Sequence, residues 1–311
     1  MNRKLTLALP FAAAGFGAAG FFLRRWQLET AFEEVSGLLI PGKPATIALV
    51  AMLIAAAAIC IAIGFAALSK NIPSGYLTNL AAPHAAVSGL DFLAGGLLVA
   101  AGAWEIGRFV ALVRDWAMFT LSDLPAVVAG AAGEFGVIRL VLSVCLIPTG
   151  ICMILVGMLG NQRDEGKGRF RSILLAPGYC ACVWLVAAYQ KHTTNPNIME
   201  YLFLLLGIVC VIFAAYAAAS FSFEKPRPIL CAVSGTMGIV LLAVSAADRP
   251  QGFDLLTLLG FGIYLLTRLI CLTACSVRPP QLTRWLPRAE TAEASEQNAE
   301  EQIQPRGEEN E

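Results

Sequence analysis

The sequence predicts an all-α fold: a polytopic transmembrane helix bundle of about eight spans, with a small extracytoplasmic hairpin and a disordered C-terminal tail. Composition is the first observation behind this prediction. Of the 311 residues, 57% are hydrophobic and 14% are charged, whereas a soluble domain of this size carries about 25% charged residues. The second observation is a series of eight apolar stretches, each near the roughly 20 residues that cross about 30 Å of hydrocarbon. Together they predict a multi-pass protein of the cell membrane, surrounded by the lipid bilayer.

The predicted spans are residues 5–23, 45–68, 86–104, 137–160, 172–190, 201–222, 229–247 and 254–276. The first span follows Arg3-Lys4, as the apolar core of a signal peptide would. It runs into Arg24-Arg25 without a clean small-residue cleavage site, so a retained span is favoured over a cleaved signal. Counts of seven or nine spans stay open, because they depend on how the segment 105–136 is assigned.

Cations in the connections between spans set the orientation of the bundle. They gather in three connections on one predicted side: 161–171, 225–227 and 278–288. Connections rich in Lys and Arg stay in the cytoplasm. Both termini are therefore predicted to be cytoplasmic.

The chain divides into a transmembrane domain, 1–278, and a cytoplasmic acidic tail, 279–311. Residues 290–311 hold eight of the 22 acidic residues and one basic residue, Arg306. The end of the tail has one large apolar residue, Ile303, and cannot bury a core, so it is predicted to be disordered.

Two outer segments are more than linkers. From Trp26 to Glu33 bulky residues alternate, and a glycine-containing turn then leads to the apolar residues 38–40. This pattern predicts a small β-hairpin, with a short amphipathic helix as the alternative. From Glu105 to Phe119 the apolar residues share one helical arc. That segment would lie flat at the outer interface or extend the third span.

Motifs of enzyme and nucleotide chemistry are missing from the sequence, which has no Walker A loop, HExxH, GxSxG or CxxC. The nine cysteines lie in or beside apolar stretches and are interpreted as packing residues. His84 and His192 lie in predicted loops and are interpreted as solvated. We therefore predict no catalytic, cofactor-binding or metal-binding residue, no cofactor and no nucleic-acid partner. Other membrane proteins are candidate partners.

Charged residues inside a span cost about 3 kcal/mol or more and are functional candidates by default. Asp91 and Arg268 lie clearly inside predicted spans, at similar depth from the cytoplasmic surface. We predict that they pair inside the bundle, with separate snorkelling to lipid head groups as the alternative. Two further groups fall near the outer interface, where water is available: Glu105 with Arg108, and Glu134 with Arg139.

Prolines mark two candidate helix breaks. Pro148 with Gly150 lies near the middle of the fourth span, and Pro177 with Gly178 lies in the first third of the fifth. Proline frees a carbonyl and kinks a helix, and in transporters such breaks supply backbone groups to a substrate. Kinks that serve only helix packing are the alternative.

A short resemblance surrounds the end of the first span. The stretch 22–45 contains Phe22-Leu23-Arg24-Arg25-Trp26-Gln27-Leu28-Glu29-Thr30-Ala31-Phe32, Ser36-Gly37-Leu38, Pro41-Gly42 and Pro44-Ala45. It resembles a stretch shared by uncharacterised multi-pass bacterial membrane proteins. The resemblance implies a membrane location and a bacterial origin, and it assigns no role to any residue.

Three function hypotheses follow. The favoured one is a non-enzymatic scaffold, sensor or accessory subunit, because the spans hold few polar groups and the tail is acidic. The alternative is a permease for a small or apolar solute, indicated by Pro148, Pro177, Asp91 and Arg268. The second alternative is a membrane-embedded enzyme, although the spans offer no paired carboxylates. A polar cavity that reaches the middle of the bilayer would favour the permease, and a fully packed bundle would favour the scaffold.

Overall fold

The computed structural model describes residues 7–33, 38–40, 42–68, 85–119, 136–159, 173–192, 198–223, 225–250 and 252–277. The elements in this part are α2 (Ala8–Thr30), α3 (Pro44–Leu68), α5 (Ala85–Phe119), α7 (Val137–Leu159), α9 (Ala176–His192), α10 (Ile198–Ser220), the 3-10 helix η1 (Phe221–Phe223), α11 (Pro228–Ala246) and α12 (Phe253–Val277). The predicted all-α class is confirmed for the described residues. The predicted disordered tail lies outside them.

Six of the described helices are long and apolar enough to cross a membrane: α3, α5, α7, α10, α11 and α12. They are consistent with an integral membrane protein. The other two α-helices in this part of the chain are less suited to crossing, because α9 has 17 residues and α2 carries Arg24 and Arg25 in its second half. The count of about eight spans stays a prediction.

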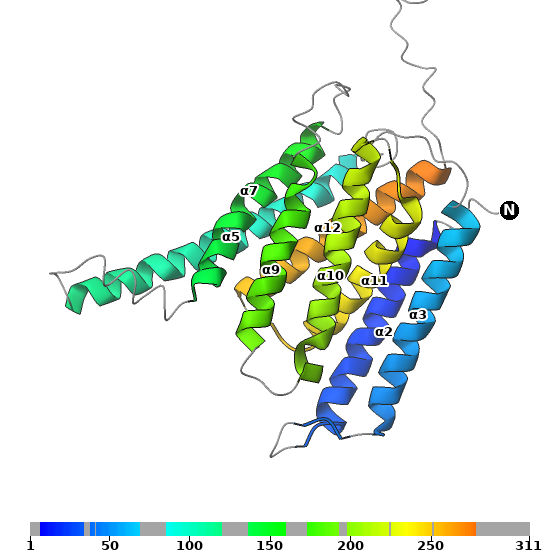
Figure 1. Cartoon of the computed structure of the whole chain (residues 1–311), viewed down its shortest axis with the longest axis horizontal. Coiled ribbons are helices and arrows are strands. Elements are labelled where there is room, and N and C mark those ends of the chain that lie inside the picture. The colour runs from blue at the N-terminus through cyan, green and yellow to red at the C-terminus, as the bar shows by residue number, and fades with distance from the viewer. Residues whose placement is uncertain are drawn as a thin grey trace, which may run out of the picture. The chain divides into compact units, whose positions relative to one another are not determined.

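Six helices close into a ring around a common core. Their contacts run in the order α5, α7, α9, α10, α11, α12 and back to α5. All six contribute side chains to one buried cluster, including Leu98, Leu146, Trp184, Val211, Leu242 and Phe261. Helices α2 and α3 lie outside the ring, where both pack on α11 (Figure 1). Any site in the interior is therefore built from the six ring helices.

Small residues bring α5 and α7 into close contact. A Cβ atom on Gly95 would meet the Gly150 carbonyl oxygen at 2.5 Å, and one on Gly102 would meet the Ser143 carbonyl oxygen at 2.6 Å. Such contacts let helix backbones approach closely in membrane bundles. A Cβ atom on Gly96 would have nothing within 4 Å, so this contact requires only one of the two adjacent glycines.

The prediction of a β-hairpin after the first span is wrong for most of the first strand, which is helical in the structure. Helix α2 continues to its end, so Trp26–Thr30 is helical, and the β-structure among the described residues is a single antiparallel bridge between Phe32 and Leu39. The helix places Arg24 and Gln27 on one face, where they hydrogen-bond. A strand would point residues three apart to opposite faces.

Helix α5 decides between the two alternatives for residues 105–119. It continues without interruption over 35 residues, so this segment extends the third predicted span. In Figure 1 its last turns run past the start of α7. The prediction of a separate interfacial helix is therefore wrong.

Candidate functional site

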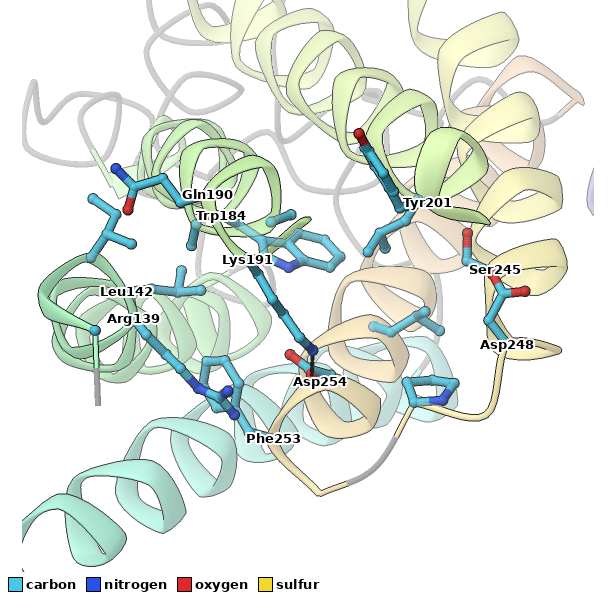
Figure 2. A pocket seen from close by; sticks show the side chains of 17 residues that line it. Arg139, Leu142, Trp184, Gln190, Lys191, Tyr201, Ser245, Asp248, Phe253 and Asp254 are labelled. Carbon is cyan, nitrogen blue, oxygen red and sulfur yellow. Dashed lines mark hydrogen bonds and ion pairs between the residues drawn. The ribbon is translucent and has the colours of Figure 1, made fainter. Parts of the chain in front are cut away.

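A cavity of about 400 Å³ opens at one end of the ring. We call this the Lys191 end. Residues from α7, α9, α10, α11, α12 and the α11–α12 connection line the cavity, as Figure 2 shows. Its volume falls within the roughly 300–1,000 Å³ of small-molecule sites. The lining combines charged and aromatic side chains: Arg139, Lys191, Asp248, Asp254, Trp184 and Tyr201.

One ion pair crosses this cavity. The Lys191 Nζ atom lies 2.6 Å from the Asp254 Oδ2 atom and joins the last turn of α9 to the first turn of α12. Phe253 and Tyr201 line the same cavity (Figure 2). The Lys191 side chain is 49% exposed and the Asp254 side chain is 31% exposed. This pair is therefore open to solvent inside the cavity.

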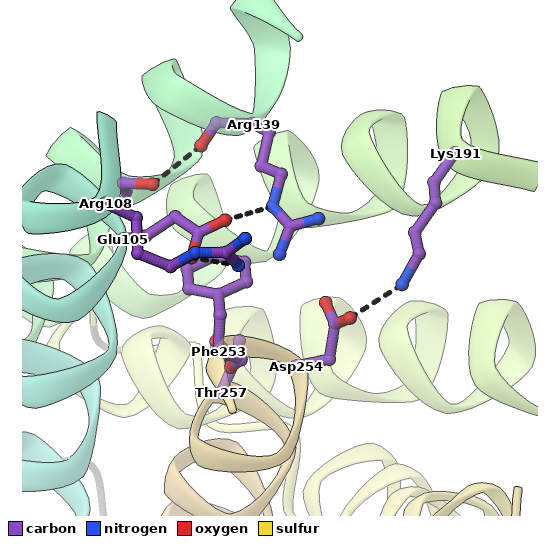
Figure 3. Close-up of polar contacts among 8 residues, drawn as sticks. Glu105, Arg108, Arg139, Lys191, Phe253, Asp254 and Thr257 are labelled. Carbon is purple, nitrogen blue, oxygen red and sulfur yellow. Dashed lines mark hydrogen bonds and ion pairs between the residues drawn. The ribbon is translucent and has the colours of Figure 1, made fainter. Parts of the chain in front are cut away.

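Behind the cavity wall, Glu105 is fully buried between two arginines. Its carboxylate forms an ion pair with Arg139 and a longer one, at 3.7 Å, with Arg108 (Figure 3). The Arg139 guanidinium also lies 5.2 Å from the centroid of the Phe253 ring, within the range of a cation–π contact. A buried carboxylate therefore balances the charge of Arg139 from behind the cavity.

A second buried charge, Arg24, lies between α2 and the ring. Its guanidinium donates to the Asp248 carboxylate and to the Gln27 side-chain oxygen, both at 2.8 Å. It also lies 5.1 Å from the centroid of the Phe203 ring. Gln27 in turn donates to the Thr46 hydroxyl of α3 at 3.0 Å. This network connects α2 and α3 to Asp248, which lines the cavity.

The cavity floor includes one of two stacked aromatic rings. Trp184 of α9 lines the cavity, and its ring stacks on Phe261 of α12 with the centroids 5.0 Å apart and the planes 12° apart. Trp184 lies midway in sequence between Lys191 and Pro177, about 10 Å from each at 1.5 Å per residue. The stack therefore lies about halfway along α9.

An ion pair lies near the other end of the ring, which we call the Asp91 end. Arg268 of α12 donates a hydrogen bond to the carboxylate of Asp91 on α5, and both side chains are buried. Gly157 leaves room for this pair, because a Cβ atom there would meet the Asp91 Cβ at 3.1 Å. A hollow of about 10 Å³ lies beside the pair, enough for about one water molecule.

The candidate break at Pro148 and Gly150 does not interrupt helix α7. Helix α7 continues through Pro148, whose ring is exposed on the outside of the ring of helices. Neither Pro148 nor Gly150 lines a described cavity. The neighbouring Thr149 hydroxyl donates to the Cys145 carbonyl at 2.7 Å, so this hydroxyl is satisfied within the helix.

Around Pro177 the chain does turn, at residues 174–175, and α9 then begins at Ala176. Pro177 is the second residue of the helix, where its missing N–H removes no helical hydrogen bond. It lines the hollow beside Asp91. A Cβ atom on Gly178 would make an ordinary 3.6 Å contact with Ala215, so Gly178 is not needed for close packing.

Comparison with known proteins finds no relative of this chain. No family model, curated protein or solved structure matches it. The resemblance of residues 22–45 to bacterial membrane proteins therefore stays a prediction. In the part of the chain that the structure describes, no group of three or more His, Cys, Asp and Glu side chains is placed to hold a metal ion.

The sequence analysis missed the residues that make the cavity. It placed Arg139 with Glu134, which lies outside the described residues, whereas the structure pairs Arg139 with Glu105. No role was predicted for Lys191 or Asp254. A usable signal was present, because charges of both signs stand at the ends of several spans on the same predicted side, where they can pair across helices.

Proposed function

We propose that this protein is a non-enzymatic permease for a small solute, and that the large cavity is the solute's entrance. The observation that carries the proposal is that the large cavity and the small hollow are both lined by α7, α9 and α12, one at each end of these helices. The stacked rings of Trp184 and Phe261 lie between them. This is the arrangement expected of a transporter that is open at one end and closed at the other.

The closed end has the features of a gate. Asp91 and Arg268 connect α5 to α12, and breaking their ion pair would let the two helices separate at that end. Isolated buried charges are costly, so the pair favours the closed state. Opening then requires that water or a solute reach both charges.

The scaffold hypothesis, favoured by composition, is less well supported by this geometry. A scaffold has no need of a cavity of about 400 Å³ lined with charges. A sensor remains the second candidate, because the aromatic stack closes the cavity floor and a solute could bind there without crossing. A sensor and a permease differ in whether the Asp91 end ever opens.

Cysteine reporters on the two sides of the stack test the proposal. Cys152 lines the hollow at the Asp91 end, and Leu142 lines the large cavity. One variant keeps Cys152 as its only cysteine, and a second carries Leu142→Cys in a cysteine-free chain. A membrane-impermeant thiol reagent is added to either side of oriented vesicles. For a permease, Leu142→Cys should react from the Lys191 side and Cys152 from the opposite side.

Asp91→Asn then serves as the opening mutation. It removes the inner ion pair, so it should raise the labelling rate of Cys152 and lower that of Leu142→Cys. A variant that keeps only Cys182 is the matched control: this residue faces outward on α9 and lines neither cavity, so the impermeant reagent should not label it with or without Asp91→Asn. If Cys152 stays protected from both sides with and without Asp91→Asn, the protein does not alternate and the sensor is the better reading.

A further inference from the structure

Among the described residues at the Lys191 end, three ion pairs include a side chain that lines the cavity, and Lys191–Asp254 is the one that a ligand can replace. Its side chains are partly exposed and it lies within the cavity. Exposed ion pairs of this kind contribute little to stability. A ligand with one positive and one negative group can therefore exchange with both partners at small cost.

The other two pairs are anchored by a fully buried partner. Arg139 is held by Glu105, and Asp248 is held by Arg24. The Glu105 and Arg24 side chains have no exposed surface, so withdrawing Arg139 or Asp248 would weaken the compensation of a buried charge. These pairs shape the cavity wall and are not available for exchange.

Aromatic side chains beside the exchangeable pair provide an apolar surface. Trp184, Phe253 and Tyr201 line the same cavity as the pair (Figure 2), with Trp184 two turns before Lys191 on α9. The ligand that fits has an ammonium for Asp254, an anion for Lys191 and an apolar or aromatic body for the rings.

We infer that the cavity binds a small zwitterion. Its ammonium group takes the place of Lys191 beside Asp254, and its anionic group takes the place of Asp254 beside Lys191. The inference rests on the proposed function and names the class of solute. Two sources supply this chemistry: a soluble amino acid with an apolar side chain, and the zwitterionic head group of phosphatidylethanolamine. Measuring binding in membranes with and without phosphatidylethanolamine distinguishes the two sources.

The test measures binding to the full-length protein in phosphatidylglycerol nanodiscs by calorimetry. The three probes share a phenyl ring. L-Phenylalanine carries both charges, 2-phenylethylamine carries the ammonium only, and 3-phenylpropionate carries the carboxylate only. L-Phenylalanine should bind at least about tenfold more tightly than either analogue, the difference expected for one charge-assisted hydrogen bond.

Two variants assign the charges. Lys191→Gln should weaken L-phenylalanine binding about tenfold, because the carboxylate loses its partner, and should not weaken 2-phenylethylamine binding, because Lys191 no longer competes for Asp254. Asp254→Asn should weaken L-phenylalanine binding similarly and should not weaken 3-phenylpropionate binding. Glu29→Gln is the matched control: it breaks the exposed Arg25–Glu29 pair, which does not line the cavity, and all three affinities should be retained.

The same titration in nanodiscs containing phosphatidylethanolamine, with native mass spectrometry of retained lipid, identifies the source. L-Phenylalanine binding that is unaffected by this lipid supports a soluble zwitterion. Retention of phosphatidylethanolamine that is lost in Lys191→Gln and Asp254→Asn supports the head group. Analogues that bind as tightly as L-phenylalanine, variants that bind like the natural chain, or no binding of either zwitterion would overturn the inference. Zwitterion binding with Cys152 protected throughout would support the ligand class and overturn the permease.

Discussion

At the scale of single residues, the protein keeps charges in an apolar setting by giving each one a partner. Asp91 and Arg268 would each cost about 3 kcal/mol or more if isolated in hydrocarbon, and the ion pair offsets part of that cost. Hydroxyls follow the same rule, because Ser245 and Thr257 donate to carbonyls one turn earlier in their own helices. The polar groups that remain available to a solute are therefore few.

The Asp91–Arg268 pair predicts a specific pattern of stability losses. Asp91→Asn and Arg268→Gln should each lower the free energy of unfolding in mild detergent by about 3–5 kcal/mol, because each leaves a buried charge without its partner. The double variant should lose less than the sum of the two. Chemical or thermal unfolding of the purified protein measures all three.

Arg25→Gln is the control for this cycle. Its partner Glu29 is exposed and 4.0 Å away, so the expected loss is below about 1 kcal/mol. Strictly additive losses for Asp91→Asn and Arg268→Gln would show that the two side chains do not interact in the folded protein.

At the scale of helices, glycine spacing determines how closely α5 and α7 approach. Gly95 and Gly102 lie two turns apart on α5, and each faces a small residue of α7, Gly150 or Ser143. Helix α12 uses the same device on α5, because a Cβ atom on Gly260 would meet the Leu98 side chain at 2.5 Å. These contacts close one side of the ring.

Adjacent glycines on α5 give a matched pair of substitutions. Gly95→Ala should destabilise the protein by about 1–3 kcal/mol, because its Cβ would overlap the α7 backbone. Gly96→Ala should be neutral or stabilise by up to about 1 kcal/mol, since the site is open and alanine favours helix. Unfolding in detergent compares the two, and equal effects would contradict the described contact.

Sequence alone predicted the helices better than the site. The apolar runs gave the helix positions to within a few residues for α3, α7, α10, α11 and α12. It did not give the rotation of each helix about its axis, so it could not show that Trp184 stacks on Phe261. The cavity residues stand at helix ends, where a linear pattern resembles an ordinary membrane interface. Asp91 and Arg268 could be recognised from the sequence, because a charged residue inside an apolar span is costly and therefore rare.

At the scale of the whole molecule, orientation decides which side of the membrane the cavity faces. The cation-rich connections 161–171 and 225–227 follow α7 and α10 at the Asp91 end. The rule that such connections stay in the cytoplasm predicts that the Lys191 end faces outward. The proposed solute would then enter from outside the cell.

Reporter fusions test this orientation. Fusions after Arg227 and after Arg288 should report the cytoplasm, and a fusion after Gly42 should report the outside. The contrast should be complete, because each reporter is separated from the opposite side by the full bilayer. An outside signal after Arg288 would mean an odd number of spans, with the segment 105–136 as the first to be reassigned.

The position of α2 outside the ring has a consequence for how the chain is made. Arg24 and its carboxylate partner Asp248 are 224 residues apart in sequence. At about 5–20 residues per second, a ribosome needs roughly 10–50 s to supply that partner after Arg24 has emerged. Gln27, three residues further along α2, is available to Arg24 throughout this interval. Helix α2 can therefore take its final place only when synthesis is nearly complete, because its partners in the folded protein include α11, α12 and the connection between them.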